Sequence, residues 1–432
     1  MQDALRDAIA LLTQLDLASA MPMFWYMIIF ELPRYTIGFA FVVALNLAPG
    51  RRLLDGDRAA DVGRLKLSVV IGGHNEAGAM RACIRSLREQ TRHIDEIIVV
   101  DDGSTDGMRR VLRELRAEGL ISRGLCNQVR CGKVAACNLG MSIAKGDIVI
   151  NLDADCSYDR DAIELLVAPF ADPRVGATCG NIGVRNPGAS IVAAWQAVEY
   201  LVSISLGKRL LDLLGIVACA SGAFGAFRRE AMLQVGILSC GPGEDLDITL
   251  RLRRSGWKIR FVADSWCLTD VPDTLAGLVR QRRRWDRDTF RIRLRKFRDA
   301  FNPGTRRFNG LETAEQLDFV LFNLMTTVSF PLYLLWLFYY YGTFAWTILL
   351  AVAIVYVALD LLAFLLANTV SRRRTPSDTL GLLIYAPSFG VFNGYFMRFV
   401  RLYAYLEEFV FRKSYRDPYV PQRVLDVAIS EV

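Results

Sequence analysis

"GDIVINLDADC", residues 146–156, is an apolar run of β-branched residues that ends in two aspartates. β-branched residues favour a strand, and a short continuous apolar run suits a strand that is buried on both faces. Asp153 and Asp155 follow the run, one residue apart. Two neighbouring carboxylates repel each other unless a cation lies between them, so this strand end predicts a divalent metal site. The simpler alternative is an ordinary turn, in which aspartate is common.

The pattern of a strand with a polar end recurs upstream. LKLSVVIGG at 65–73 and DEIIVVDDGS at 95–104 are β-branched runs that close in polar loops. Apolar residues recur at helical spacing over 77–90, and further helices are predicted near 107–118 and 133–145. This alternation predicts an α/β domain with a mixed, mainly parallel sheet. The ligands of such a sheet gather beyond the carboxyl ends of its strands.

The composition of the chain indicates that part of it lies in a membrane. The chain has 432 residues, of which 53% are hydrophobic, and a formal net charge of +7. Its mean hydropathy of +0.26 predicts that part of it lies in lipid. Nine cysteines without a CxxC pair, and only two histidines, argue against a zinc site or a disulfide framework. The positive charge suits nucleic acid, anionic lipid or an anionic substrate equally.

Apolar stretches flank the α/β domain. A membrane helix is predicted within 24–47, and the arginines at 51 and 52 place the next segment in the cytoplasm. Residues 273–301 mix many cations with apolar residues at helical spacing, which predicts helices on a cytoplasmic membrane surface whose cations face lipid headgroups.

The C-terminal third predicts membrane spans. Residues 319–342 and 344–367 are each long enough to cross a bilayer of about 30 Å, and SRRR at 371–374 is predicted to be cytoplasmic. The broken apolar stretch from 380 to about 400 is expected either to cross or to re-enter. The predicted division is an N-terminal membrane segment (1–52), a cytoplasmic domain (53–270), interfacial helices (271–318), a C-terminal transmembrane region (319–412) and a tail (413–432).

Three motifs offer groups that suit a nucleotide. Asp101 and Asp102, in DDGSTDG, offer acceptors for the imide and ribose hydroxyls of a nucleoside, or cap a turn and the following helix. Glu76 closes GHNE at the end of the first strand, where a simple cap is the alternative. Lys133 begins a predicted helix, where the helix dipole and the cation suit an anionic ligand; the alternative is a solvated surface lysine.

Two later motifs suit catalysis and diphosphate binding. Glu244 and Asp245 lie in a Gly/Pro loop before an amphipathic helix. They are either first-turn acids favoured by the helix dipole or include a general base for an acceptor hydroxyl. QRRRW at 281–285 offers guanidinium groups for a diphosphate and an indole face for a sugar ring. It also fits a basic interfacial helix with an aromatic anchor.

The order of these motifs resembles the processive family-2 glycosyltransferases. HNE, DDGSTD, GKxxACN, DAD, GED and QRRRW occur in the family's order and at about its intervals over residues 66–300. The chain looks like the membrane-embedded synthases of poly-N-acetylglucosamine, chitin (including nodulation chitooligosaccharides), hyaluronan and cellulose. The resemblance implies a GT-A-type nucleotide-sugar-binding domain with interfacial and transmembrane helices. It also implies a multi-pass protein of a bacterial-type inner (plasma) membrane with a cytoplasmic catalytic domain.

The resemblance also implies roles for individual residues. The expected catalytic base is Asp245, with Glu244 as its neighbour. The expected metal ligands, for Mg²⁺ or Mn²⁺, are Asp153 and Asp155. His74 stands in GGHNE where the family has a tyrosine, and it is the candidate to replace that side chain at the uracil. The expected donor-site residues are Glu76, Asp101, Asp102, Lys133, Asp153, Gln281 and Arg284. The residues expected at the acceptor are Ser221 and Gly222 of SGAFGAFRRE, and Trp285.

The implied reaction is processive, inverting transfer from a UDP-sugar to a growing β-glycan, with translocation of the polymer across the membrane. UDP-N-acetylglucosamine is the first expectation, because EDLDITLRLRRSGW and VGATCGNIGVRN resemble the poly-N-acetylglucosamine branch. A UDP-glucose-dependent β-glucan synthase and a non-processive enzyme that glycosylates a lipid are the alternatives within the family. The expected partners are the donor, the glycan acceptor, membrane lipid and an unspecified accessory subunit.

Two alternatives come from other functional classes. The first is a transporter that carries a nucleotide-binding regulatory domain, but such a sensor has no need of Asp245, Arg284 and Trp285. The second is a nucleic-acid binder that uses the basic helix at 280–298. Its cations flank predicted membrane spans, so lipid headgroups explain them better and no nucleic-acid partner is expected.

Overall fold

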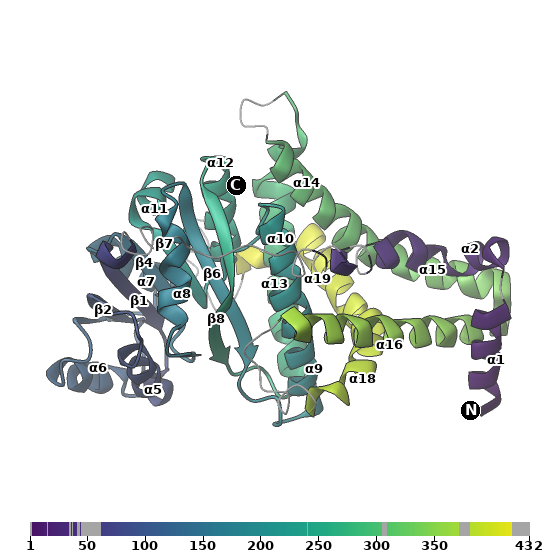
Figure 1. The fold of residues 1–432 in the computed structure, drawn as a ribbon, viewed down its shortest axis with the longest axis horizontal. Helices are drawn as coiled ribbons and strands as arrows, with labels where there is room; N and C mark the ends of the chain where they lie inside the picture. Colours follow the sequence, from purple (N-terminus) through teal and green to yellow (C-terminus); the bar gives the residue numbers. More distant parts are fainter. Residues whose placement is uncertain are drawn as a thin grey trace.

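A computed structural model describes most of the chain. The described residues are 2–14, 16–33, 36, 38–40, 44, 62–239, 241–304, 309–370 and 381–416. Three features of the sequence analysis lie outside them, namely the arginines at 51 and 52, the SRRR run and the tail beyond residue 416. Figure 1 shows a sheet domain from which a group of helices extends to one side.

One half of the sheet is parallel. The eight strands lie in the order β3-β2-β1-β4-β7-β6-β8-β5, and the first four are mutually parallel neighbours. Their carboxyl ends therefore meet at one edge, where the sequence predicts the ligands. These strands are β1 (Leu67–Gly73), β2 (Glu96–Asp101), β3 (Arg123–Cys126) and β4 (Ile148–Leu152).

The other half mixes both directions. β7 is antiparallel to β4 and to β6, β8 is parallel to β6, and β5 pairs antiparallel with β8. The predicted mixed sheet is confirmed. These strands are β5 (Ser157–Tyr158), β6 (Val175–Val184), β7 (Phe224–Arg228) and β8 (Lys258–Thr269).

Helices cover both faces of the sheet. The three predicted between 77 and 145 are present with nearly the predicted bounds. The helices of the sheet domain are α5 (Ala77–Arg88), α6 (Met108–Ala117), α7 (Lys133–Ile143), α8 (Ala162–Val167), α9 (Ile191–Glu199), α10 (Lys208–Leu213), α11 (Arg229–Val235) and α12 (Glu244–Arg254).

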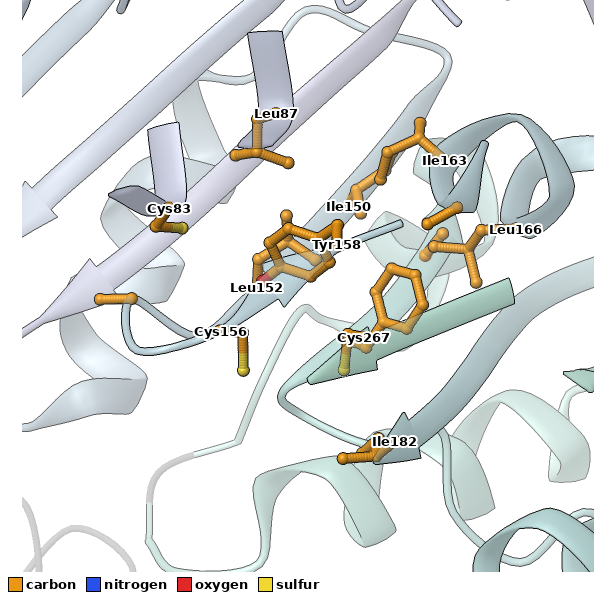
Figure 2. Packing of buried hydrophobic residues seen from close by; sticks show 14 of the residues in the cluster. Cys83, Leu87, Ile150, Leu152, Cys156, Tyr158, Ile163, Leu166, Ile182 and Cys267 are labelled. Carbon is orange, nitrogen blue, oxygen red and sulfur yellow. The ribbon is translucent and has the colours of Figure 1, made fainter. Parts of the chain in front are cut away.

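The two cores meet at β4. Ile150 and Leu152 point into the cluster drawn in Figure 2, together with Tyr158, whereas Val149 belongs to the cluster on the opposite face. A strand alternates its side chains between faces, so Asn151 lies on the Val149 side. Both faces of β4 are buried, and in the loop after Leu152 the aspartates Asp153 and Asp155 are partly exposed.

A group of helices follows the sheet domain. Among the described residues, one helical run, Gly310–Asn368, is long and apolar enough to cross a membrane. The run turns back at Gly342, so that α15 and α16 form a hairpin (Figure 1). Its two legs correspond to the spans predicted at 319–342 and 344–367. The helices are α13 (Leu275–Arg291), α14 (Gly310–Phe319), α15 (Thr326–Tyr341), α16 (Ala345–Val370), α18 (Ala386–Val391) and α19 (Met397–Phe411).

Three arginines of the predicted interfacial segment bond to protein carboxylates, partners that the sequence analysis did not predict. Arg282 pairs with Glu199 at 2.7 Å, and Arg283 pairs with Glu407 at 2.8 Å. Further along, Arg295 of the π-helical turn after α13 bonds to the buried Glu408 of α19 at 2.7 Å. The carboxylates that neutralise the latter two arginines lie more than 110 residues away in the sequence, so a local pattern could not reveal them.

The N-terminal segment packs against the hairpin. α1 (Gln2–Gln14) lies against α16, and α2 (Leu17–Tyr26) contacts both legs and leads into a π-helical turn, Met27–Glu31. The described part of the membrane helix predicted within 24–47 is thus helical, and its Phe24, Tyr26 and Met27 are buried among apolar side chains.

Candidate active site

A pocket of about 260 Å³ opens at the carboxyl ends of β1, β2 and β4. The topology alone explains why distant motifs meet here, because parallel strands end at the same edge. Seven of the predicted site residues line it: Glu76, Asp102, Lys133, Asp153, Asp155, Glu244 and Arg284.

The two aspartates after β4 stand at the pocket wall. Burial raises the pKa of Asp155, and the neighbouring charge of Asp153 raises it further. The same two acids, after burial, raise the pKa of Glu76. Three carboxyl groups therefore share one region of negative potential. The repulsion inferred from the sequence is present in the structure.

Lys133 supplies the opposing charge. It is the first residue of α7, and its Nζ lies 2.5 Å from Asp153 Oδ1. Burial disfavours its charged form, but the charges of Asp153 and Glu244 outweigh burial and raise the pKa of Lys133. Its side chain is 40% exposed toward the pocket. The cation at the helix start is therefore held between acids that come from two other elements.

The side chains of Asp101 and Asp102 both accept hydrogen bonds from backbone amides. Asp102 accepts from the amides of Cys131 and Gly132 at 2.8 and 2.7 Å and from Asn127 Nδ2 at 3.2 Å. It thus ties the loop before α7 to the end of β2 and fixes where Lys133 begins. Asp101 Oδ1 accepts from the Ser104 amide at 2.9 Å, and Asp101 does not line the pocket. Their predicted contacts with a nucleoside stay predictions.

Glu244 and Asp245 are the first two residues of α12 rather than loop residues. They follow Gly243, whose φ of +78° lies in the region that glycine tolerates. Burial raises the pKa of Glu244, and the nearby charge of Lys133 partly offsets this. Glu244 consequently takes up a proton more readily than an ordinary glutamate does.

The predicted acceptor segment lies against Asp245. The Gly222 amide donates to Asp245 Oδ2 at 3.2 Å, and Asn151 Nδ2 donates to the Gly222 carbonyl at 3.1 Å. Nearby, the Ala220 amide donates to Thr249 Oγ1 at 2.8 Å. Residues 220–222 are thus held from β4 and from α12 beside the predicted base.

Gln281, Arg284 and Trp285 lie on one face of α13, because they are three and four residues apart. Arg284 reaches the pocket, whereas Gln281 and Trp285 do not line it. Trp285 is 38% exposed, and the Arg282 guanidinium lies 4.6 Å from its ring centre.

α13 is fixed to the loop before α12 by close contacts. Arg291 donates to the Pro242 carbonyl. A Cβ on Gly243 would come within 2.5 Å of Ile292 Cδ1. The Arg291–Pro242 hydrogen bond and the close approach of Gly243 to Ile292 place α13, which carries Arg284, against the start of α12, which carries Glu244.

Comparison with known proteins agrees with this geometry. Residues 68–236 match the family described as glycosyl transferase family 2. This part of the chain is thus similar to family-2 glycosyltransferase domains. The matched range contains β1 to β7 and the acids at the ends of β1, β2 and β4, whereas Asp245 and α13 lie beyond it.

Two curated relatives carry the same name, poly-beta-1,6-N-acetyl-D-glucosamine synthase. The protein from Staphylococcus aureus is 30% identical over 272 residues, which is 62% of this chain and 60% of the relative. The protein from Staphylococcus epidermidis is 30% identical over 233 residues, 54% of this chain and 56% of the relative. This chain thus spans about 60% of the length of the curated relatives it matches.

A solved structure extends the likeness to the fold. A mannosyltransferase from Pyrobaculum calidifontis, in complex with GDP-Man and Mn²⁺, superposes with a TM-score of 0.58 at 20% identity. The match covers 91% of this chain and 99% of the mannosyltransferase. The GT-A glycosyltransferase fold expected from the motifs is confirmed.

The sheet domain also contains site residues that the motif analysis did not single out. Asn151 and Thr249 hold the acceptor segment, and Arg130 lines the pocket.

His74, the candidate at the uracil, also lines the pocket and bonds through Nδ1 to the Asp102 carbonyl at 2.9 Å. A carbonyl oxygen only accepts, so Nδ1 carries the proton. Asn151 stood within the opening sequence run, but nothing local distinguishes it from a polar strand residue.

The donor set at the β4 end suits Mg²⁺ or Mn²⁺. Asp153 and Asp155 offer only oxygen ligands, which these cations prefer. Among the residues that the structure describes, no three His, Cys, Asp or Glu side chains are already arranged around a common metal position. Two protein carboxylates leave the remaining ligand positions to phosphate and water, which is the usual way in which Mg²⁺ is held. The pocket therefore fits a metal that binds together with a nucleotide.

Proposed function

We propose that this chain is an inverting glycosyltransferase that extends a β-linked polysaccharide from a UDP-sugar. The observation that carries the proposal is the pocket that joins Asp153, Lys133 and Arg284 to the first turn of α12. The names of the curated relatives favour UDP-N-acetylglucosamine as the donor. Their partial coverage makes the substrate part of the proposal.

In the proposed reaction, Asp245 accepts the proton of an acceptor hydroxyl, whose oxygen then attacks the anomeric carbon of the donor. The bond from that carbon to the diphosphate breaks, and UDP leaves with the electron pair. One displacement inverts the anomeric carbon, so an α-linked donor gives a β-linked product. The Gly222 amide orients Asp245 through Oδ2. Arg284 and Lys133 face the leaving diphosphate with positive charge.

Asp153 and Asp155 are proposed to hold Mg²⁺ or Mn²⁺. When bound, the cation would stabilise the negative charge that develops on the diphosphate. The mannosyltransferase with a similar fold was solved with Mn²⁺ and a nucleotide sugar, which supports a divalent cation at this place.

We further propose that the enzyme is processive and sits in a bacterial-type inner membrane with its catalytic domain in the cytoplasm. The proposed parts are those of the sequence analysis: 1–52, 53–270, 271–318, 319–412 and 413–432. Support comes from α13, which carries Arg284 at the pocket and lies between the sheet domain and the α15–α16 hairpin (Figure 1). A glycan released at this junction has a short path to the membrane.

Asp245→Asn tests the base. We expect loss of UDP release from UDP-N-acetylglucosamine in the detergent-solubilised chain, with retained UDP binding, because the amide cannot accept the proton. UDP-glucose and UDP-glucuronate, each with Mg²⁺ or Mn²⁺, complete the donor panel.

The matched control is Glu230→Gln. Glu230 is an exposed acid in the first turn of α11, so it shares the helix position of Asp245 without its surroundings. Normal turnover by Asp245→Asn would remove the base assignment. An absence of UDP release from every donor with the native chain would remove the proposed reaction.

A further inference from the structure

The helix α19 exposes apolar residues and buries most of its charged residues. Every exposed residue of α19 is apolar or aromatic. Phe399, Tyr403, Leu406 and Val410 are between 47% and 59% exposed, whereas Arg398, Glu407 and Glu408 are at most 8% exposed. The fourth charged residue, Arg401, is partly buried and pairs with Asp286 of α13 at 3.4 Å. A helix on the surface of a water-soluble protein shows the opposite pattern.

The polar side of α19 is occupied by protein. Glu407 accepts from Arg283 of α13 at 2.8 Å and from Lys413 at 2.7 Å. Glu408 accepts from Arg295 at 2.7 Å and from the Ser414 amide at 2.8 Å. The charges therefore attach α19 to the helix that carries Arg284. The opposite side is apolar, and Tyr403 at its edge lies with its ring centre 4.6 Å from the Arg283 guanidinium of α13.

The apolar residues form a continuous stripe. Residues 399, 403, 406 and 410 are spaced by four, three and four, which puts them on one helical face. Apolar patches of this kind, on otherwise charged proteins, are typical of surfaces that meet another apolar phase.

The neighbours of the stripe indicate that this phase is lipid. The ring of Phe399 contacts that of Phe330 in α15 at 5.7 Å between centroids. Beyond this contact α15 exposes Leu332 and Leu335, at 61% and 70%, and both belong to the run that is long and apolar enough to cross a membrane. The stripe thus continues the hairpin surface. It ends at the exposed Arg412, a charge that suits a lipid headgroup.

We infer that the Phe399–Tyr403–Leu406–Val410 face of α19 docks onto the acyl-chain and headgroup boundary of the bilayer. The inference rests on the membrane location proposed above. It assigns α19 a role that the arginines of α13 were expected to fill. The lipid contact is apolar and belongs to α19, while α13 is held at the membrane surface through Glu407 and Glu408.

Site-specific photocrosslinking tests this surface. The full chain is reconstituted into nanodiscs of phosphatidylethanolamine and phosphatidylglycerol, with p-benzoylphenylalanine in place of Leu406 or Val410. The positive control position is Leu335 of α15. The negative control is Leu233 of α11, an apolar residue that is 45% exposed on the sheet domain. UDP release by each preparation reports separately on the proposed reaction.

After irradiation we expect the chain to gain the mass of one lipid at positions 406, 410 and 335, and none at 233. A crosslink from 406 to a second copy or to a co-purified protein would overturn the inference, as would the absence of lipid adducts at 406 and 410 while 335 reacts. Because adduct mass is read independently of turnover, an inactive preparation that still gives lipid adducts contradicts the enzyme assignment and leaves the docking surface supported.

Discussion

Lys133 is the cation around which the acids of the pocket are arranged. It pairs with Asp153 at 2.5 Å, and the charge of Glu244 also favours its protonated form. A fixed ammonium in a partly desolvated pocket attracts phosphate more strongly than one in water does. The structure therefore gives this single side chain two tasks, the neutralisation of Asp153 and the attraction of a diphosphate.

Lys133→Met is expected to weaken UDP binding about 10- to 100-fold, the range that follows from losing a charge-assisted hydrogen bond of roughly 1.5–3 kcal/mol. Isothermal titration calorimetry with UDP and Mn²⁺ measures it. The control is Lys145→Met, because Lys145 is an exposed lysine shortly after the same helix. If the native chain and Lys133→Met bind UDP equally well, Lys133 does not attract the diphosphate and its only role is to pair with Asp153.

At the scale of elements, α12 is the helix whose placement decides the chemistry. Its first turn carries Glu244 and Asp245, and its next acid, Asp247, is 2% exposed. Asp247 bonds to Arg251 at 2.7 Å and pairs with Lys296 at 3.0 Å. Lys296 follows α13, so this ion pair couples the helix of the predicted base to the helix of Arg284.

Asp247→Asn is expected to lower the free energy of unfolding by about 3 kcal/mol, because it leaves two partly buried cations without their carboxylate. Burial alone would raise the pKa of Asp247, but Arg251 and Lys296 outweigh it and lower the pKa from 3.8. A carboxyl group whose pKa is lower in the folded than in the unfolded chain stabilises the fold at any pH above its pKa in the unfolded chain. This stabilisation is lost as the pH falls through the pKa of the folded chain.

Thermal unfolding of the native chain and of Asp247→Asn over a pH series measures both effects. The gap between the two proteins should be full at neutral pH and should narrow as the pH falls below 3.8. A gap that is the same at every pH would contradict an ionised Asp247 as its cause.

At the scale of the whole molecule, one buried ion pair joins the two ends of the described chain. Arg398 of α19 pairs with Glu31, the last residue of the π-helical turn after α2. Arg398 also donates to the hydroxyls of Tyr26 at 2.6 Å and Tyr356 at 3.1 Å. All of these groups are buried, so the pair fixes how the N-terminal segment sits on the C-terminal helices.

Glu31→Gln is expected to destabilise the detergent-solubilised chain by roughly 3–5 kcal/mol, because it leaves the buried Arg398 charge without its counter-ion. Thermal unfolding measures the loss. The double variant Glu31→Gln with Arg398→Met should recover much of it, since removing both charges also removes their desolvation cost. A double variant no more stable than Glu31→Gln would mean that the loss comes from packing rather than from charge.

The parallel half of the sheet and its helices followed from local pattern. β-branched runs, helical spacing of apolar residues and polar strand ends act over a few residues, and each is legible in the chain itself. Because parallel strands end at one edge, the same pattern predicted that Glu76, Asp102 and Asp153 would share a pocket, and they do. The two legs of the hairpin were predicted from apolar length in the same way.

The sequence by itself determined the parallel half of the sheet with its helices and, through the order of its motifs, the resemblance to family-2 glycosyltransferases. Only the tertiary structure decided which partner each charged or polar side chain has. Arg282 and Arg283 of α13 bond to Glu199 and Glu407. Asn151 holds Gly222 across 71 positions. The physical reason is range. Propensity and periodicity act between neighbours in the chain, whereas a hydrogen bond or an ion pair depends on which distant segment the fold brings within about 3 Å.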